Sequence, residues 1–233
     1  NQRLTRHPHD FRDVGVDQFF LDADDTIDAP ALENAVREAT DSESDLYFLK
    51  YQINFHEEHR TREMFDADKK LWEKFKEART NTELRAIAAG LINYPWNRII
   101  STDLLHDENI FFGPTVVHND IPFHWHSIVV AKKIGYSDLS VCTHRKFETR
   151  AQITNINDRR RLMVFEALRV TQDCITQYST FSSVSHTWEA FAGHVIGWAK
   201  SRVTKDFEGV YREKELSFMR SVSKIVKEEE VNV

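Results

Sequence analysis

Two aspartates and a threonine behind an apolar segment are the residues of this chain best suited to chemistry. The apolar run at 19–21 has the composition of a buried strand, and Asp22, Asp24 and Thr26 follow it directly. In open α/β folds, ligands and catalytic groups gather at the ends of strands. Carboxylates placed there could bind a divalent cation or attack an electrophile. Aspartate is also favoured in turns and at helix N-caps, so these aspartates, with Asp28, can equally form a strand-to-helix connection.

The order of these residues resembles a known motif. An apolar strand, then Asp22-x-Asp24-x-Thr26, then a helix opened by Asp28 and Pro30 is similar to motif I of the haloacid dehalogenase-like phosphohydrolases, over about 20 of the 233 residues. The resemblance implies that Asp22 attacks phosphorus to form an aspartyl-phosphate, that Asp24 is the general acid and base, and that Thr26 stabilises the turn. It also implies Mg²⁺ between the first carboxylate and the phosphate, and a phosphorylated small molecule or protein as substrate.

The other sites of that family have partial counterparts here. Ser101 or Thr102, after the apolar pair at 99–100, could supply the hydroxyl that ends a second strand. The segment 116–120 stands where the family has paired acids, and by this resemblance Asp120 joins the two motif aspartates as a metal ligand. No lysine lies between Thr102 and Asp120, and a histidine and an asparagine replace the first of the paired acids. The chain therefore departs from the family at both positions.

Histidines near Asp120 suggest an alternative metal site. His118, His124 and His126 lie close together in the sequence. We expect His124 and His126 on a strand, where alternate residues face the same side. With Asp120 they would offer nitrogen and oxygen donors to a metal. The other interpretation is that Trp125 packs inward and both histidines lie on a polar face.

Three consecutive arginines suggest a different class of function. Arg159, Arg160 and Arg161 follow Asp158, which we expect to cap a helix. Cations at a helix N-terminus oppose the helix dipole, and this local conflict indicates an anionic partner. The second interpretation is therefore a non-catalytic binding or assembly module, whose helical C-terminal half and arginines hold a protein or RNA partner. Ion pairs at a solvated helix end would explain the same arginines without a partner.

The composition excludes several classes of protein. A net charge of -6 gives no broad basic face, and the chain has only 7 glycines and no glycine-rich nucleotide-binding motif. Cys142 and Cys174 form no CxxC pair, which excludes a zinc ribbon. So few cysteines favour reduced thiols and a soluble, intracellular protein. No apolar run reaches the roughly 18–20 residues of a membrane span, so we expect no membrane partner, while an oligomer is left open.

The hydrophobic pattern predicts the framework that must position these residues. We expect a helix-rich α/β or α+β fold, with a helix between strands at 16–22 and 46–53 that favours a parallel pair. Charged and capped segments predict helices at 57–79 and from residue 80. Further strands are expected at 99–100, 110–112, 115–117, 128–130 and 139–141. After about residue 155, apolar residues recur at helical spacing to the end of the chain.

These elements imply an arrangement in three parts. Residues 1–15 are expected to form a polar N-terminal arm. Residues 16–150 are expected to form an α/β core with a small, mostly parallel sheet. Residues 151–233 are expected to form a helical region packed against that core, within one integrated domain.

Overall fold

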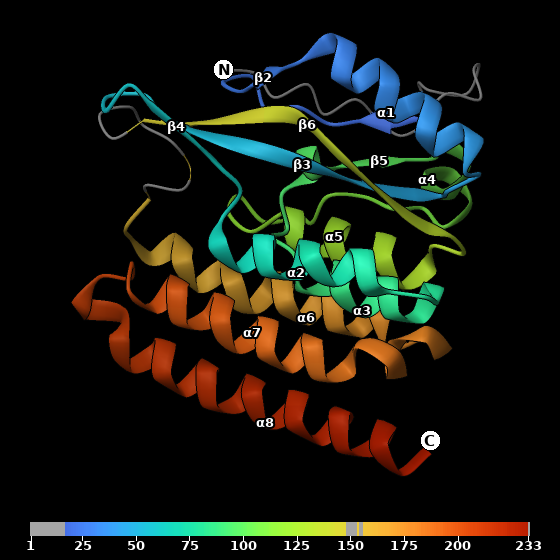
Figure 1. Ribbon diagram of the computed structural model, residues 1–233. Helices are drawn as coiled ribbons and strands as arrows, with labels where there is room; N and C mark the ends of the chain where they lie inside the picture. The colour runs from blue at the N-terminus through green and yellow to red at the C-terminus, as the bar shows by residue number, and fades with distance from the viewer. Residues whose placement is uncertain (1–16, 148–152, 154–155, 233) are drawn as a thin grey trace.

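A curled, mixed sheet separates one helix from most of the others in the computed structural model (Figure 1), which describes residues 17–147, 153 and 156–232. The strands are β1 (Gln18–Phe19), β2 (Thr26–Ile27), β3 (Leu46–Phe55), β4 (Arg60–Glu63), β5 (Arg98–Ile100) and β6 (Ile134–Lys146). The α-helices are α1 (Ala29–Asp41), α2 (Asp66–Glu77), α3 (Asn81–Gly90), α4 (Thr102–Asp107), α5 (Asp120–Val130), α6 (Val164–Ile175), α7 (Ser185–Lys200) and α8 (Glu208–Asn232). Short 3₁₀ segments are η2 (Pro95–Asn97), η4 (Arg159–Met163), η5 (Ser179–Val184) and η6 (Lys205–Phe207).

The helix-rich α/β class and the helical C-terminal part are confirmed. Helix α1 covers one face of the sheet, and the longer helices α2, α3, α5, α6, α7 and α8 lie beneath the opposite face, with α8 farthest from the sheet (Figure 1). A small cluster of buried residues around Ala35, Leu49 and Val141 lies under α1. The main core lies on the other side, where four fully buried tryptophans come from α2, η2, α5 and α7. No described helix has both the length and the apolar composition needed to cross a bilayer.

The sheet itself is mixed, whereas the sequence favoured parallel pairing of segments 16–22 and 46–53. Among the described strands, β3 and β6 form the one parallel pair, and the four other pairings are antiparallel. The strand order is β1-β5-β3-β6-β2, with β4 also paired to β3. Strand β5 therefore lies between β1 and β3, so the first two strand segments of the sequence are not neighbours.

A β-bulge between β3 and β6 changes which residues of β3 face the main helical layer. While β3 advances from Leu49 to Tyr51, β6 advances from Ser137 to Cys142, so β6 has three more residues than β3 there. Because side chains alternate along a strand, such an irregularity can reverse the face on which they lie. Phe48 before the bulge and Ile53 after it both belong to the main core, and His144 of β6 lies opposite Ile53 on the same face.

Several local expectations are confirmed because caps act within a few residues. Helix α1 begins where Asp28 accepts a hydrogen bond from the amide of Ala31 at 2.9 Å, with Pro30 in the first turn. Helix α3 begins with a capping box between Thr80 and Glu83.

Other expected elements are wrong. The segment 57–79 is not one helix, because β4 precedes α2, and neither 110–112 nor 115–117 is a strand. The segment 128–130 is the end of α5. Residues Ile121–Val130 of this helix are all buried, so its sequence has no polar face and no helical period. Residues 1–15, expected as an arm, lie outside the described residues.

Candidate functional site

The motif aspartates lie in a tight turn between β1 and β2. The amide of Asp25 donates to the carbonyl of Asp22 at 3.0 Å, which closes the turn. Asp22 is exposed and Asp24 is partly buried, so both side chains lie at the surface of the fold. Thr26 does not stabilise this turn from within. It is an exposed residue of β2 that pairs with Thr143 of β6.

Asp25 is the aspartate that fastens this turn to the sheet. Its side chain has no exposed area, and both of its oxygens lie 3.1 Å from Nδ1 of His144. The amide of Arg145 donates to the same carboxylate at 2.8 Å, and the guanidinium of Arg145 donates to the carbonyl of Asp24. A buried carboxylate needs such donors, because an unpaired one is strongly disfavoured. The carboxylate turn (residues 22–25) is therefore held to the end of β6 by side-chain contacts.

An aromatic pair holds His144 in place. Its ring stacks on Trp96 with centroids 5.3 Å apart and lies 5.3 Å from the ring of Tyr94. Tyr94 and Trp96 flank Pro95, in the segment that follows α3. Because the Nδ1–H of His144 points to Asp25, its Nε2 is the ring nitrogen left for another partner.

Tyr94 links the turn to Asp120. Burial raises the pKa of the Tyr94 hydroxyl far above its ordinary value, and the nearby carboxylates of Asp120, Asp25 and Asp22 raise it further. Asp120 is the first residue of α5 and is partly buried. The fold therefore brings Asp120 and the carboxylate turn to the same tyrosine, although almost a hundred residues separate them in the sequence.

A buried arginine lies beneath this cluster. Arg98 is fully buried, and burial lowers its pKa to about 9, while Asp120 acts in the opposite direction. Its guanidinium donates to Nδ1 of His124 at 2.7 Å, to Oδ1 of Asn97 at 2.9 Å and to the carbonyl of Tyr94 at 3.3 Å. Because arginine can only donate, His124 must accept at Nδ1 and carry its proton on Nε2. Burial and the charge of Arg98 lower the pKa of His124, so it is neutral.

The three histidines of the alternative metal site do not converge. His124 and His126 lie on a helix, not a strand, so they point in different directions. His124 binds Arg98, and His126 lies 3.0 Å from the hydroxyl of Tyr178. His118 packs against the edge of Trp198.

Within the described part of the chain, no group of three or more His, Cys, Asp or Glu side chains is arranged to hold a metal ion. The set Asp22, Asp24 and Asp120 is therefore not a ready-made metal centre. Mg²⁺ at this site stays a prediction.

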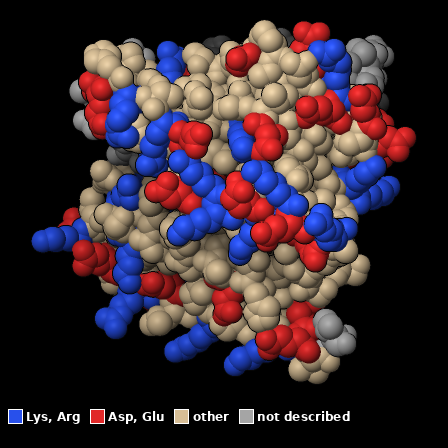
Figure 2. Space-filling view, in the orientation of Figure 1, with Lys and Arg blue, Asp and Glu red and all other residues tan. Residues whose placement is uncertain are grey.

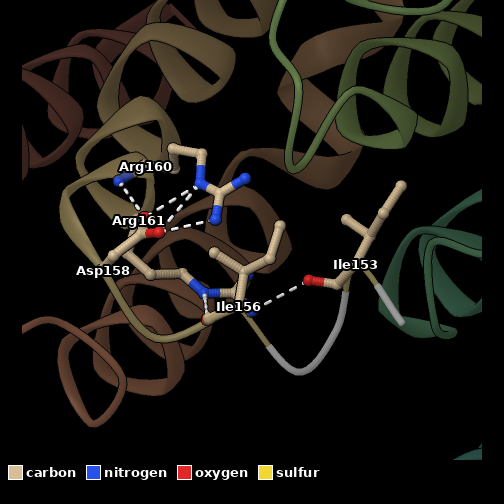
Figure 3. Close-up of polar contacts among 5 residues, drawn as sticks. All are labelled: Ile153, Ile156, Asp158, Arg160 and Arg161. Carbon is tan, nitrogen blue, oxygen red and sulfur yellow. Dashed lines mark hydrogen bonds and ion pairs between the residues drawn. The ribbon is translucent and has the colours of Figure 1, made fainter. Parts of the chain in front are cut away.

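The three arginines differ in environment, and Figure 3 shows two of them, Arg160 and Arg161. Arg160 folds back onto Asp158, with Nη2 and Oδ2 2.6 Å apart, and Asp158 caps η4 as expected. Arg161 is buried, donates to the carbonyl of Ile156 at 2.7 Å and lies over the ring of Trp198. Arg159 is exposed, and its charge helps to lower the pKa of Asp158. The three do not form one basic strip.

Ser101 and Thr102, the hydroxyl residues expected at the end of a second strand, have structural roles. Ser101 caps α4 by accepting from the amide of Leu104 at 3.1 Å. Thr102 is buried and accepts from Nε2 of Gln18 at 3.2 Å, which ties α4 to β1.

The residues that sequence reasoning missed are Asp25 as the anchor, His144, Tyr94 and Arg98. The run of aspartates at 22–25 was visible, but nothing in the sequence paired Asp25 with a histidine 119 positions away. Tyr94 and Arg98 looked like parts of a helix break and a strand.

Comparisons with known proteins give a fold likeness. No family model and no curated protein matches the sequence. S. aureus TarS 1–349 in complex with UDP-GlcNAc is similar in structure, with a TM-score of 0.54 and 17% identity over 90% of this chain and 67% of that one. TarS 1–349 alone gives a TM-score of 0.53 and 16% identity, over 93% of this chain and 68% of that one. The chain thus spans about two thirds of these structures, and the likeness concerns the fold.

This likeness corrects the expected function. The phosphohydrolase interpretation was wrong, because the similar folds are those of TarS, seen with UDP-GlcNAc, and not of a magnesium-dependent phosphatase. The aspartate motif did not identify the function, because a strand, an acidic turn and a capped helix occur in many α/β folds. The binding module stays a prediction, although Arg161, one of its three arginines, is buried.

Proposed function

We propose that this chain carries the catalytic face of a glycosyltransferase and binds a nucleoside-diphosphate sugar of the UDP-GlcNAc kind at the carboxylate turn. The observation that carries the proposal is the approach of this turn and Asp120 to Tyr94, on a fold similar to that of a sugar transferase bound to UDP-GlcNAc. Fold likeness alone would not be sufficient, since one fold hosts many functions.

The turn suits a divalent cation whose remaining ligands come from the substrate and from water. Asp22 and Asp24 offer hard carboxylate oxygens at the surface, and the described residues include no third ligand in place. Mg²⁺ is commonly held by one or two carboxylates, with substrate phosphates and water as the other ligands. A cation bound this way would neutralise the charge of the departing diphosphate.

The anchoring of the turn supports this role. Arg145 holds the carbonyl of Asp24 and the side chain of Asp25, and the amide of Asp25 holds the carbonyl of Asp22, so the backbone that carries Asp22 and Asp24 needs little reordering to meet a ligand. Preorganised groups lose less free energy on binding than flexible ones.

Asp120 is the residue we assign to proton transfer. In glycosyl transfer, the acceptor hydroxyl oxygen bonds to the anomeric carbon, the bond from that carbon to the diphosphate breaks, and UDP leaves. The hydroxyl proton must pass to a base. Asp120 is partly exposed, comes from a different element than the turn and lies near enough to Tyr94 to raise its pKa, so we assign it to the acceptor while the turn holds the donor.

Titration of the chain with UDP-GlcNAc and Mg²⁺ or Mn²⁺ by calorimetry tests the donor site. We expect cation-dependent binding that weakens at least tenfold, about 1.4 kcal/mol, in Asp22→Asn and Asp24→Asn. Asp28→Asn is the matched control, because asparagine caps α1 as well as aspartate and removes the same charge. Cation-dependent binding that is equal in all four proteins would refute the site, as would no binding at millimolar ligand.

A separate assay tests Asp120. Asp120→Asn should bind UDP-GlcNAc with nearly wild-type affinity but release UDP at least a hundredfold more slowly. An unchanged rate of UDP release would remove Asp120 from the reaction.

A further inference from the structure

Basic side chains of β4 and of the end of β6 lie on the same face of the sheet as His144. Arg62 of β4 lies opposite Ile53 of β3, which lies opposite His144 of β6. Lys146 is two residues beyond His144, so it shares this face and lies about 7 Å further along the strand. The register therefore places Arg62 and Lys146 beside the candidate site.

The two cations share one pair of aromatic rings. The guanidinium of Arg62 lies 5.5 Å from the ring centres of both Phe55 and Phe65. Nζ of Lys146 lies 4.8 Å from the ring centre of Phe65 and 5.8 Å from that of Phe55. The rings hold the stems of both side chains and bring two like charges together.

A third cation approaches from the helical layers. Arg202, in the connection between α7 and α8, lies with its guanidinium 4.2 Å from the ring centre of Trp198. Burial lowers the pKa of Lys146, and the charges of Arg62 and Arg202 lower it further. Both arginines therefore act on Lys146.

These cations have no acidic partner in the described part of the chain. The acids of the nearby hairpin face other residues, since Glu58 pairs with Arg60 at 2.8 Å and Glu63 lies 3.4 Å from Lys69. The buried Nε–H of Arg62 has no hydrogen-bond acceptor. Elsewhere, the face in Figure 2 has its basic and acidic side chains intermixed.

We propose that Arg62, Lys146 and Arg202 form a binding site for a phosphate-bearing anion, next to the carboxylate turn. Contact with aromatic rings does not satisfy guanidinium N–H donors, whereas phosphate oxygens do, in the geometry that arginine prefers. An anion would also remove the repulsion among the three cations. The anion is either the diphosphate of a nucleotide sugar or a phosphate of a second ligand.

Calorimetry with inorganic pyrophosphate, with a chelator present and no divalent cation, tests this site. We expect saturable one-to-one binding, weakened at least fivefold in Arg62→Met and in Lys146→Met, which keep the apolar stem and lose the charge. Lys132→Met, at an exposed lysine, is the control. Without pyrophosphate, Lys146→Met should melt at or above the wild-type temperature because a repulsion is removed, and pyrophosphate should raise its melting temperature less than that of the wild type.

Equal affinity in the wild type and both variants would overturn the proposal. So would displacement by sodium chloride at matched ionic strength, which indicates a diffuse field. The Asp22→Asn variant should bind pyrophosphate normally, so this result is independent of the proposed function. Competition between UDP-GlcNAc and pyrophosphate would assign the site to the donor, and simultaneous binding would assign it to a second ligand.

Discussion

The buried pair of Asp25 and His144 gives the sharpest prediction about this fold. We consider His144→Phe, which keeps a flat ring between Trp96 and Tyr94 but removes the Nδ1–H donor. Oδ2 of Asp25 would then lose its described partner, and Oδ1 would keep the amide of Arg145. Because the Asp25 side chain has no exposed area, water cannot replace the lost donor.

The expected cost follows from burial. A hydrogen bond to a charged group contributes about 1.5–3 kcal/mol, and the full penalty applies when the remaining partner stays buried. We therefore expect His144→Phe to lower the free energy of unfolding by about 2–3 kcal/mol. His144→Asn, whose side-chain amide can take the place of Nδ1–H, should recover part of this loss.

The chain contains a matched control at the surface. His186 lies 3.2 Å from Glu230, nearly the same distance, but these side chains are 68% and 54% exposed. Exposed pairs contribute little, so His186→Phe should change stability by less than about 0.5 kcal/mol. Urea unfolding at pH 7 measures both variants.

A double-mutant cycle decides whether the pair is the cause. If Asp25 and His144 act on each other, His144→Phe should cost at least about 1 kcal/mol less in an Asp25→Asn background. A cost below about 0.5 kcal/mol in the wild type, or the same cost in both backgrounds, would refute the reasoning. Under the proposed function, His144→Phe should also weaken cation-dependent UDP-GlcNAc binding, although Asp22 and Asp24 are intact.

Three further predictions concern stability and are measured by urea or thermal unfolding. Burial raises the pKa of Asp68 from 3.8 to about 6, so the free energy of unfolding should fall by about 3 kcal/mol as the pH rises from 3 to 7, and Asp68→Asn should abolish that dependence. A pH profile shared by both proteins would contradict this. Thr80→Ala removes the N-cap of α3 and should cost about 1 kcal/mol, whereas Thr80→Ser should cost little. Gly135→Ala would place a Cβ 2.5 Å from the ring of Tyr47 and should cost about 1–3 kcal/mol, less in a Tyr47→Leu background; equal costs would exclude this contact.

Local signals in the sequence predicted local structure well. The caps at Asp28 and Thr80 were predictable, because a cap depends on a side chain and an amide three residues away. The C-terminal helices were predictable from their apolar spacing. Helix α5 was not, because Ile121–Val130 are buried on every side and leave no periodic pattern.

The candidate site was only half visible before the fold was known. Acidic residues after an apolar run marked the turn, but their chemistry was assigned to the wrong reaction. The partners that give the turn its rigidity come from β6 and from the segment after α3, far away along the chain. No spacing rule connects such residues.

The sequence by itself determined that this is a helix-rich α/β protein with an acidic turn between its first strand and first helix, because periodicity and capping act over a few residues. Only the tertiary structure decided which aspartate is buried against His144 and which carboxylates lie near enough to Tyr94 to raise its pKa. It also decided that Arg161 is buried, and that Arg62 and Lys146 have no acidic partner among the described residues. The physical reason is that burial and charge pairing depend on which strands become neighbours and in which register, and here these are set by β5 lying between β1 and β3 and by the bulge between β3 and β6.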